Sequence, residues 1–253
     1  LGAALVLCSI GCARRAGIPE DRWVFIHALA EGKDVDLSRR DDPGHSVALD
    51  EVMRAALEQA EVDDPAGLLL DLYSCFPCAV SAAAGALGLP ADDGQPLTLT
   101  GGLPFFGGPG NNYAMHGIAA AVARLRREPQ RLALVSAVGG MLSKHAVGVY
   151  GCRPGRHDWA RADTSIDSSA QVTREIVDDP GSGRLVTYVV NFSRGEPAQV
   201  MAMGQADDGR RFVATSAPGD RETVTAFMAA PAVGRLLRVT AAGEGRLHFT
   251  LAD

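Results

Sequence analysis

Lysine is nearly absent from this sequence, and the cations that it has are almost all arginine. Of 24 lysine and arginine residues only Lys33 and Lys144 are lysines, and 30 acidic residues bring the formal charge to −6. A chain of net negative charge offers no general attraction to phosphate backbones or anionic membranes, which require clustered excess cation. We therefore expect neither nucleic acid nor a membrane as a partner. The bias towards arginine, alanine and glycine is typical of bacterial genomes of high GC content.

Long apolar runs and a paired set of cysteines are also missing. No apolar run approaches the roughly 20 residues that a membrane-spanning helix needs. The cysteines are odd in number and irregular in spacing: Cys8, Cys12, Cys75, Cys78 and Cys152. This set argues against a secreted disulfide framework and favours the cytoplasm. The first residue is Leu1 rather than Met, so we expect either a fragment of a longer protein or a subunit that needs a second chain.

The apolar residues that are present form an alternating pattern in the first part of the chain. They make up 47% of 253 residues, enough to bury one large core or two modest ones. Apolar runs of strand length alternate with segments of helical spacing, which indicates a layered α/β domain. The expected strands are residues 3–9, 23–30, 68–72, 132–137 and 146–150, the last two forming a hairpin, and the expected helices are residues 47–60, 79–87 and 113–127.

The pattern changes after Cys152, where a polar stretch is followed by short apolar segments separated by Asp-Gly and Pro-Gly turns. We expect a first domain over residues 1–153, a linker over 154–168 and a β-rich domain over 169–253. Five short strands and one helix in so few residues favour a small Greek-key barrel of the oligonucleotide/oligosaccharide-binding type. The expected strands are residues 186–192, 200–205, 212–216, 236–241 and 247–251, with a helix over 221–229.

A glycine-rich loop leads into the helix expected at residues 113–127. Backbone N–H groups at Gly107, Gly108 and Gly110, directed by the dipole of that helix, are suited to holding an anion or a developing oxyanion. A tight crossing of two backbone segments would require the same glycines. Both interpretations stay open on the residues alone.

A second candidate is the run YSCFPC at a strand-to-helix junction, where α/β proteins often place functional groups. Cys75 is a candidate thiolate acid/base there. Cys75 and Cys78 also have the C-x-x-C spacing of a redox or metal pair, with Cys8 and Cys12 as a possible second half-site. Buried cysteines that pack as small apolar side chains are commoner than either.

Two histidines are candidate general bases. His116 lies on the helix after the glycine loop, and His145 follows the Gly139–Gly140 turn. Histidine titrates near neutral pH and is the usual acid/base side chain. A single histidine on an alanine-rich helix is also commonly structural.

Three motifs in order resemble the C-terminal half of thiolases: LYSCF at residues 72–76, GGLPFFGGPG at 101–110 and SAVGGM at 136–141. The resemblance extends over residues 1–152 and is greatest to sterol-carrier-type thiolases and thiolase-like type 1 proteins, which also carry an additional C-terminal domain. It implies a layered α-β-α half-domain, coenzyme A thioesters as substrates and no resident cofactor or metal. It also implies an N-terminal half, in the same full-length chain or in a separate subunit, which carries the nucleophilic cysteine.

The resemblance assigns roles to four positions of this sequence. Tyr73 stands where the family has an oxyanion-binding Asn or His, and Cys75 matches the acid/base cysteine of His-Asp-Cys-Phe. Gly108 replaces the histidine of Gly-His-Pro, and Ser136 stands at or near the cysteine of the third motif. Loss of a general base typically lowers a rate by about 10²- to 10⁴-fold. The departures therefore bear directly on whether the chain is catalytic.

Two functions follow from the sequence. The first is an acyltransferase related to acetyl-CoA acetyltransferase, active in lipid metabolism, with Cys75, Tyr73, His116 and His145 as catalytic candidates. The glycine loop, Ser136 and Gly139 would then bind the acyl-CoA substrate. The second is a catalytically deficient protein of the thiolase fold that binds acyl-CoA or serves as a scaffold. Gly108 favours the second function and Cys75 favours the first.

Overall fold

The structure, a computed structural model, describes residues 1–90, 94–156, 164–166 and 171–252. Its contacts divide the chain into two compact units. The first unit consists of Leu1–Asp34 with Gly44–Gln171, and the second of Val35–Pro43 with Val172–Asp253. Much of the expected linker, residues 157–163 and 167–168, lies outside the described residues. The sequence did not predict that residues 35–43, which follow the first long strand, belong to the second unit.

The first unit is built on one mixed sheet with the strand order β2-β3-β4-β1-β5. β3 and β4 form the expected hairpin, β1 is antiparallel to β4, and β2 is parallel to β3. Apolar runs form the central strands because both faces of the sheet are covered over most of their length. The strands are β1 (Phe25–Lys33), β2 (Leu69–Asp71), β3 (Leu132–Gly139), β4 (Lys144–Gly151) and β5 (Ser165–Ile166).

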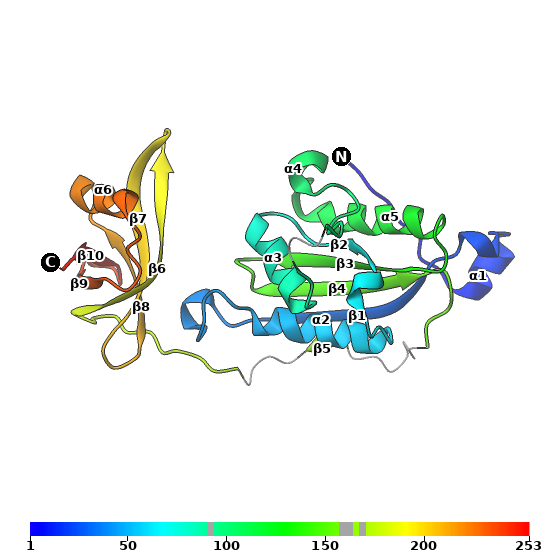
Figure 1. The fold of residues 1–253 in the computed structure, drawn as a ribbon, viewed down its shortest axis with the longest axis horizontal. Helices are drawn as coiled ribbons and strands as arrows, with labels where there is room; N and C mark the ends of the chain where they lie inside the picture. The colour runs from blue at the N-terminus through cyan, green and yellow to red at the C-terminus, as the bar shows by residue number, and fades with distance from the viewer. Residues whose placement is uncertain (91–93, 157–163, 167–170, 253) are drawn as a thin grey trace. The chain divides into compact units, whose positions relative to one another are not determined.

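Helices cover the two faces of this sheet, with α2 on one side and α5 on the other (Figure 1). Ser46 caps α2 through a hydrogen bond from the Leu49 N–H, and Pro77 opens α3, where its missing N–H costs nothing. The helices and short 3₁₀ segments are α1 (Ile10–Arg15), η1 (Glu20–Arg22), η2 (Leu37–Arg39), α2 (Val47–Gln59), η3 (Pro65–Gly67), α3 (Pro77–Ala86), α4 (Leu103–Phe106), η4 (Gly110–Asn112) and α5 (Tyr113–Leu125).

Two apolar clusters fill the space between the sheet and the helices. One joins α2 and α3 to the sheet through residues such as Val52, Leu134 and Val149, all with no exposed surface. The other joins α5 to the opposite face through Ala121 and Leu125. The layered α/β fold expected from the sequence is confirmed in this unit.

The strand expected at residues 3–9 is wrong. Residues 1–8 have no regular secondary structure, and Val6 is 90% exposed. The apolar run resembles a buried strand, but no described strand pairs with it. Pairing partners, rather than local composition, decide whether such a segment becomes a strand.

The second unit is a closed five-stranded barrel with the strand order β10-β8-β7-β6-β9. Gly204 permits close packing in its core, because a Cβ atom there would lie 2.1 Å from the Phe212 ring. The core contains Phe212, Phe227 and Phe249. The elements are β6 (Ser182–Ser193), β7 (Glu196–Gln205), β8 (Arg211–Ser216), α6 (Arg221–Ala229), β9 (Leu236–Ala241) and β10 (Leu247–Leu251).

Residues 35–43 form a strap on this barrel unit. The Arg174 N–H donates to the Arg39 carbonyl at 2.8 Å, and the Arg174 side chain pairs with Asp41. Arg211, on β8 and 4% exposed, donates from Nη2 to the Asp41 carbonyl at 2.9 Å. The strap therefore covers a buried arginine on the outside of the barrel.

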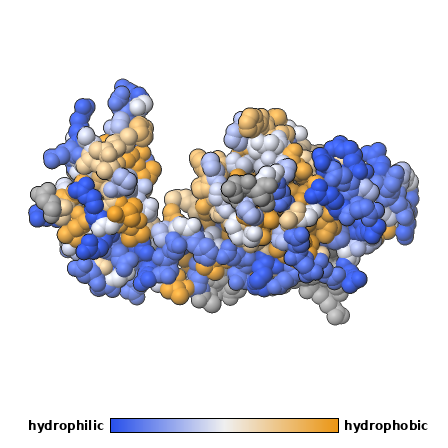
Figure 2. Space-filling view, viewed as in Figure 1, coloured by the Kyte–Doolittle hydropathy of each residue, from blue (hydrophilic) through white to orange (hydrophobic). Residues whose placement is uncertain are grey.

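The surface of the first unit carries apolar side chains around the glycine-rich loop. Figure 2 shows apolar residues over the α4 region, where Phe105 is 89% exposed. None of the helices in the described part of the chain is long and apolar enough to cross a membrane.

Candidate functional site

The last residue of strand β2, Asp71, is a buried carboxylate that hydrogen-bonds to the chain leading into the glycine-rich loop. Asp71 has no exposed surface, and its Oδ1 accepts hydrogen bonds from the N–H groups of Leu99 at 2.8 Å and Thr100 at 3.2 Å. The Thr100 hydroxyl lies 3.3 Å from the same oxygen. Burial raises the pKa of Asp71, and these hydrogen bonds act in the opposite direction. Asp71 thus fixes the chain entering the glycine-rich loop to the end of the strand.

Hydroxyl groups extend this network to both ends of the loop. Tyr113, the first residue of α5 and 1% exposed, hydrogen-bonds through its phenol to the Thr100 hydroxyl. Thr100 Oγ1 accepts from the Gly102 N–H at 3.2 Å, and Ser74 Oγ accepts from the Leu103 N–H at 3.0 Å. Burial raises the pKa of Tyr113, so the phenol stays neutral at physiological pH.

Aromatic rings pack beside this network. Tyr73 meets Tyr113 edge to face at 5.6 Å between ring centroids, and Phe106 meets Tyr113 at 6.1 Å. Phe106 also meets the His116 ring at 5.1 Å. We call Tyr73, Phe106, Tyr113 and His116 the aromatic cluster. It brings together two of the predicted catalytic residues, Tyr73 and His116, from elements far apart in the sequence.

His116 presents one nitrogen as a hydrogen-bond acceptor. Nδ1 lies 2.9 Å from the carbonyl of Asn112, and because a carbonyl only accepts, Nδ1 carries the proton. Nε2 is buried and has no hydrogen-bond partner, and the residue is 6% exposed. A buried nitrogen lone pair without a donor is uncommon in folded proteins and is consistent with a base.

The glycine-rich loop needs glycine at some positions but not at others. Gly107 and Gly110 have φ of 101° and 59°, in the region that favours glycine. Gly108 differs, because the only atom within 4 Å of a Cβ built there is Leu103 Cδ2, at 3.8 Å. The fold therefore has room for a side chain at Gly108.

Cys75 and Ser136 lie on either side of Tyr73 but have different environments. Cys75 is partly exposed and stands two residues before Pro77, the first residue of α3, so it precedes the helix rather than forming part of it. Ser136 is 2% exposed, and its Oγ accepts from the Tyr73 N–H at 3.0 Å. Burial and the nearby Cys75 both raise the pKa of Tyr73. Ser136 therefore positions the Tyr73 backbone.

His145 lies apart from the aromatic cluster. It is 3% exposed, and its Nε2 lies 3.0 Å from Ser46 Oγ and 3.2 Å from the Leu142 carbonyl. Ser46 also donates to Asp34 at 2.5 Å and caps α2. His145 thus connects the β3–β4 hairpin to the start of α2, while α5 and His116 cover the other face of the sheet.

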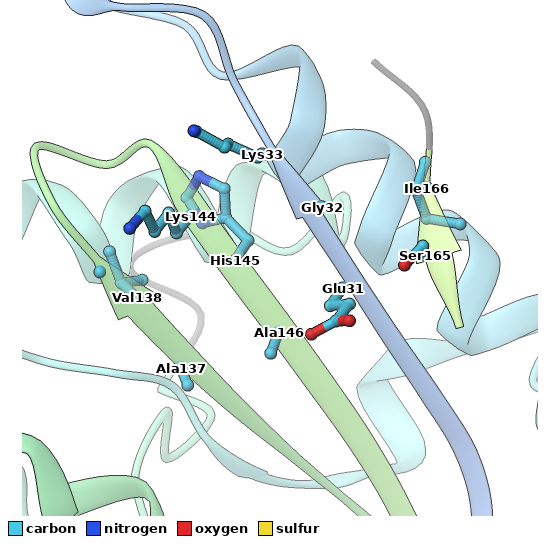
Figure 3. A pocket seen from close by; sticks show the side chains of 11 residues that line it. Glu31, Gly32, Lys33, Ala137, Val138, Lys144, His145, Ala146, Ser165 and Ile166 are labelled. Atoms are coloured by element: carbon cyan, nitrogen blue, oxygen red, sulfur yellow. The ribbon is translucent and has the colours of Figure 1, made fainter. Parts of the chain in front are cut away.

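An open groove is lined by residues of β1, β3, β4 and β5, close to the turn of the β3–β4 hairpin (Figure 3). It has a volume of about 470 Å³ and includes Gly139, one of the predicted binding residues. A smaller groove of about 290 Å³, which includes Ser136, lies beside α5. The residues Gly107, Gly108 and Gly110 line neither groove.

Within the described ranges, no three His, Cys, Asp or Glu side chains gather as a metal site would require. Cys8, Cys12 and Cys78 are exposed and all five cysteines are free thiols. The alternative of a cysteine-ligated metal has no geometric support there.

The sequence alone did not single out Asp71, Thr100 or Tyr113. A signal was present, because Asp71 is the one charged residue in the apolar run before YSCF, and a charge in a buried strand requires partners. Those partners, at residues 99–100 and 113, could not be identified without the fold.

The chain is similar to a solved structure, described as the "Crystal structure of a monomeric SCP2-thiolase like protein type 1 (STLP1) from Mycobacterium smegmatis". The match covers 96% of this chain at 39% sequence identity, with a TM-score of 0.87. It covers 54% of the other chain, so the present chain spans about half the length of that relative. No protein-family model and no curated protein matches the sequence. The chain therefore has the fold of SCP2-thiolase-like proteins, as the three motifs predicted.

Proposed function

We propose that the chain is the C-terminal part of a thiolase-like protein that transfers acyl groups from coenzyme A thioesters. The observation that carries this proposal is the similarity over 96% of the chain to an SCP2-thiolase-like protein. The rest of the protein, in the same or another chain, supplies the nucleophilic cysteine. The proposal places this chemistry in acyl-chain metabolism in the cytoplasm.

In this proposal, side chains around the Asp71 network carry out the separate steps of acyl transfer. Cys75, partly exposed beside Tyr73, exchanges a proton with the leaving or attacking group. Tyr73 and the N–H group of Gly108 line the thioester oxygen site. The other two predicted donors are already used, because the Gly107 N–H donates to the Leu103 carbonyl at 2.9 Å and the Gly110 N–H to the Gly108 carbonyl at 2.8 Å. His116 supplies an unprotonated nitrogen in the same cluster.

The barrel unit has a separate, non-catalytic role in this proposal. Its closed five-stranded order, with α6 between β8 and β9, supports the assignment of an oligonucleotide/oligosaccharide-binding type of barrel. We assign it no nucleic-acid ligand, because single-strand binding needs a basic groove with stacking aromatic residues.

A second function is favoured by Gly108, which replaces the motif histidine at a position where the fold would accept one. A protein that kept the fold and lost this base would bind acyl-CoA without transferring the acyl group. Both functions predict acyl-CoA binding and only the first predicts turnover.

The distinguishing experiment compares Cys75→Ser with Cys78→Ser in the full natural polypeptide. Cys78 is a matched control because it is exposed and lies in the same stretch. If Cys75 is the acid/base, its Ser variant should lower acetyl-CoA exchange by at least about 10²-fold, with binding changed only a few fold. The control should keep full exchange. Acetyl-CoA binding without exchange in the unchanged protein would establish the second function, and absence of acetyl-CoA binding would refute both acyl-CoA functions.

A further inference from the structure

Tyr113, the first residue of α5, contacts both of the residues that precede Cys75 in the chain. Its ring meets the Tyr73 ring edge to face at 5.6 Å between centroids, and its phenol hydrogen-bonds to the Ser74 hydroxyl. Tyr113 is itself held in place, because it is 1% exposed, packs against Phe106 and belongs to a helix of 13 residues. A buried side chain on a long helix therefore holds the segment that leads to the candidate acid/base.

The hydroxyl groups around Tyr113 form a chain in which each proton has one place. Thr100 donates its hydroxyl proton to Asp71 Oδ1 at 3.3 Å, so the Thr100 oxygen accepts from Tyr113. The Tyr113 proton is then used on Thr100, so the Tyr113 oxygen accepts from the Ser74 hydroxyl. We call Ser74, Tyr113 and Thr100, which end on Asp71, the hydroxyl chain. The buried carboxylate thus sets the direction of each donor up to the residue beside Cys75.

The Ser74 end of the hydroxyl chain also contacts the glycine-rich loop. Ser74 Oγ accepts from the Leu103 N–H at 3.0 Å, and a Cβ built on Gly102 would lie 2.9 Å from the same oxygen. Gly102 has a φ of 82°, in the region that favours glycine, so the loop backbone approaches Ser74 more closely than another residue would allow. Ser74, 9% exposed, is therefore enclosed between Tyr113 and the start of α4, and rotation of its side chain would break both hydrogen bonds.

We propose that Tyr113 is a positioning residue for Cys75, which it orients through the hydroxyl chain and through Tyr73. This assignment rests on the acid/base role proposed above for Cys75 and adds the residue that orients it. Cys75 precedes α3, so the helix does not fix its position, and the contacts of Tyr73 and Ser74 do so instead. A displacement of about 1 Å at a reacting group can lower a rate by about 10²-fold. Tyr113 therefore acts on the rate of acyl transfer rather than on substrate binding.

The first measurement is the rate at which iodoacetamide alkylates Cys75 in the full natural polypeptide, read by peptide mass spectrometry. Tyr113→Phe removes the hydroxyl and keeps the ring, and Thr100→Val breaks the hydroxyl chain one link further from Cys75. Each variant should raise the Cys75 alkylation rate by about 5-fold, the effect of one lost hydrogen bond on local opening. The double variant should match the single ones, because the chain is already broken. Thr100→Ser keeps the hydroxyl and should keep the rate of the unchanged protein.

Two other cysteines separate a local change at Cys75 from unfolding of the first unit. Cys78, exposed in the same stretch, should keep its alkylation rate, and so should Cys152, whose thiol donates to the Leu125 carbonyl at 3.4 Å. Tyr188→Phe, which removes a hydroxyl from a residue packed on Phe227 in the barrel unit, should change none of the rates. A variant that also speeds alkylation of Cys152 unfolds the unit, and Ser74→Ala, which breaks the chain beside Cys75, then decides by the same comparison.

Acetyl-CoA exchange is the second measurement, and it separates this proposal from the function on which it rests. Tyr113→Phe should lower kcat by about 10-fold or more and change KM by less than about 3-fold, because positioning acts on the transition state. Thr100→Ser should keep the kcat of the unchanged protein. Absence of exchange in the unchanged protein overturns the proposed acyl transfer, and the alkylation rates then still decide whether Tyr113 orients Cys75.

Three results overturn the positioning role. The first is an equal Cys75 alkylation rate in the unchanged protein, Tyr113→Phe and Thr100→Val. The second is an unchanged kcat in Tyr113→Phe when the unchanged protein catalyses exchange. The third is a double variant alkylated about 25-fold faster, the product of two independent effects, because it would show that the two hydroxyl groups do not act as one chain.

Discussion

Gly117 on α5 is the position where one added methyl group tests the Asp71 network most directly. A Cβ built on Gly117 would lie 2.3 Å from Asp71 Oδ2, 3.2 Å from Asp71 Cγ and 3.2 Å from Val135 Cγ1. Overpacking a buried site costs about 1–3 kcal/mol. For Gly117→Ala we expect a cost at the upper end of this range, because hydrogen bonds from Leu99 and Thr100 keep the Asp71 carboxylate from moving away.

The helix preference of alanine offsets part of this cost. Replacing an interior helical glycine by alanine stabilises by about 1 kcal/mol, so Gly117→Ala should destabilise the first unit by about 2 kcal/mol. Gly85→Ala on α3 is the matched control, since nothing lies within 4 Å of a Cβ built there, and it should stabilise by up to about 1 kcal/mol. Urea unfolding followed by circular dichroism measures both changes.

A double-mutant cycle identifies the atom responsible. In an Asp71→Ala background the closest contact is gone, so Gly117→Ala should cost at least about 1 kcal/mol less than in the unchanged protein. Equal stability of Gly117→Ala and Gly85→Ala would refute the close packing of α5 on Asp71. Equal cost of Gly117→Ala in both backgrounds would assign the strain to Val135 instead.

Three further predictions concern the pH dependence, the glycine loop and the barrel. The pKa of Asp71 is raised from its ordinary value of 3.8. The folded state therefore binds the Asp71 proton more tightly than the unfolded state does. The free energy of unfolding that this proton contributes is lost as the pH rises through the folded-state pKa. Asp71→Asn should therefore gain stability relative to the unchanged protein as the pH rises above the ordinary carboxyl pKa of 3.8 in urea titrations. A difference that does not change with pH would contradict the raised pKa. Gly108→His should lower the free energy of unfolding by less than about 1.5 kcal/mol in the same assay, because the nearest atom to a Cβ built there is 3.8 Å away. A rise in acyl exchange in this variant would identify the missing base as the group that limits the rate. Residues 169–253 should show no salt-dependent binding of single-stranded DNA or RNA at micromolar concentration in fluorescence anisotropy, and such binding would refute the non-nucleic-acid role.

Local patterns predicted most of the regular elements. The strands at residues 236–241 and 247–251 and the helix at 221–229 have the expected bounds, because alternation, helical spacing and turn residues act over a few neighbours. Strands β6 and β7 are longer than the expected strands at residues 186–192 and 200–205. The β6–β7 hairpin continues its strand pairing into polar residues, and an apolar alternation pattern cannot predict strand structure there.

The candidate site was predicted only in part for the same reason. The three motifs identified Tyr73, Cys75 and the glycine loop, because these residues are contiguous in the sequence. Sequence reasoning treated His116 and His145 as equivalent, whereas the structure places His116 beside Phe106 and His145 against Ser46. Which face of a strand or helix a side chain occupies depends on register, and register is set by pairing across the fold.

The sequence by itself determined the alternation of strands and helices, the β-rich second unit and the likeness to thiolases, since each depends on residues close together in the chain. Only the tertiary structure decided that residues 3–9 form no strand and that residues 35–43 join the barrel. It alone brought Lys33 beside Lys144. The physical reason is that pairing and burial join segments far apart in the sequence, and a carboxylate, a cation or an apolar run acquires its role from the partners that the fold places against it.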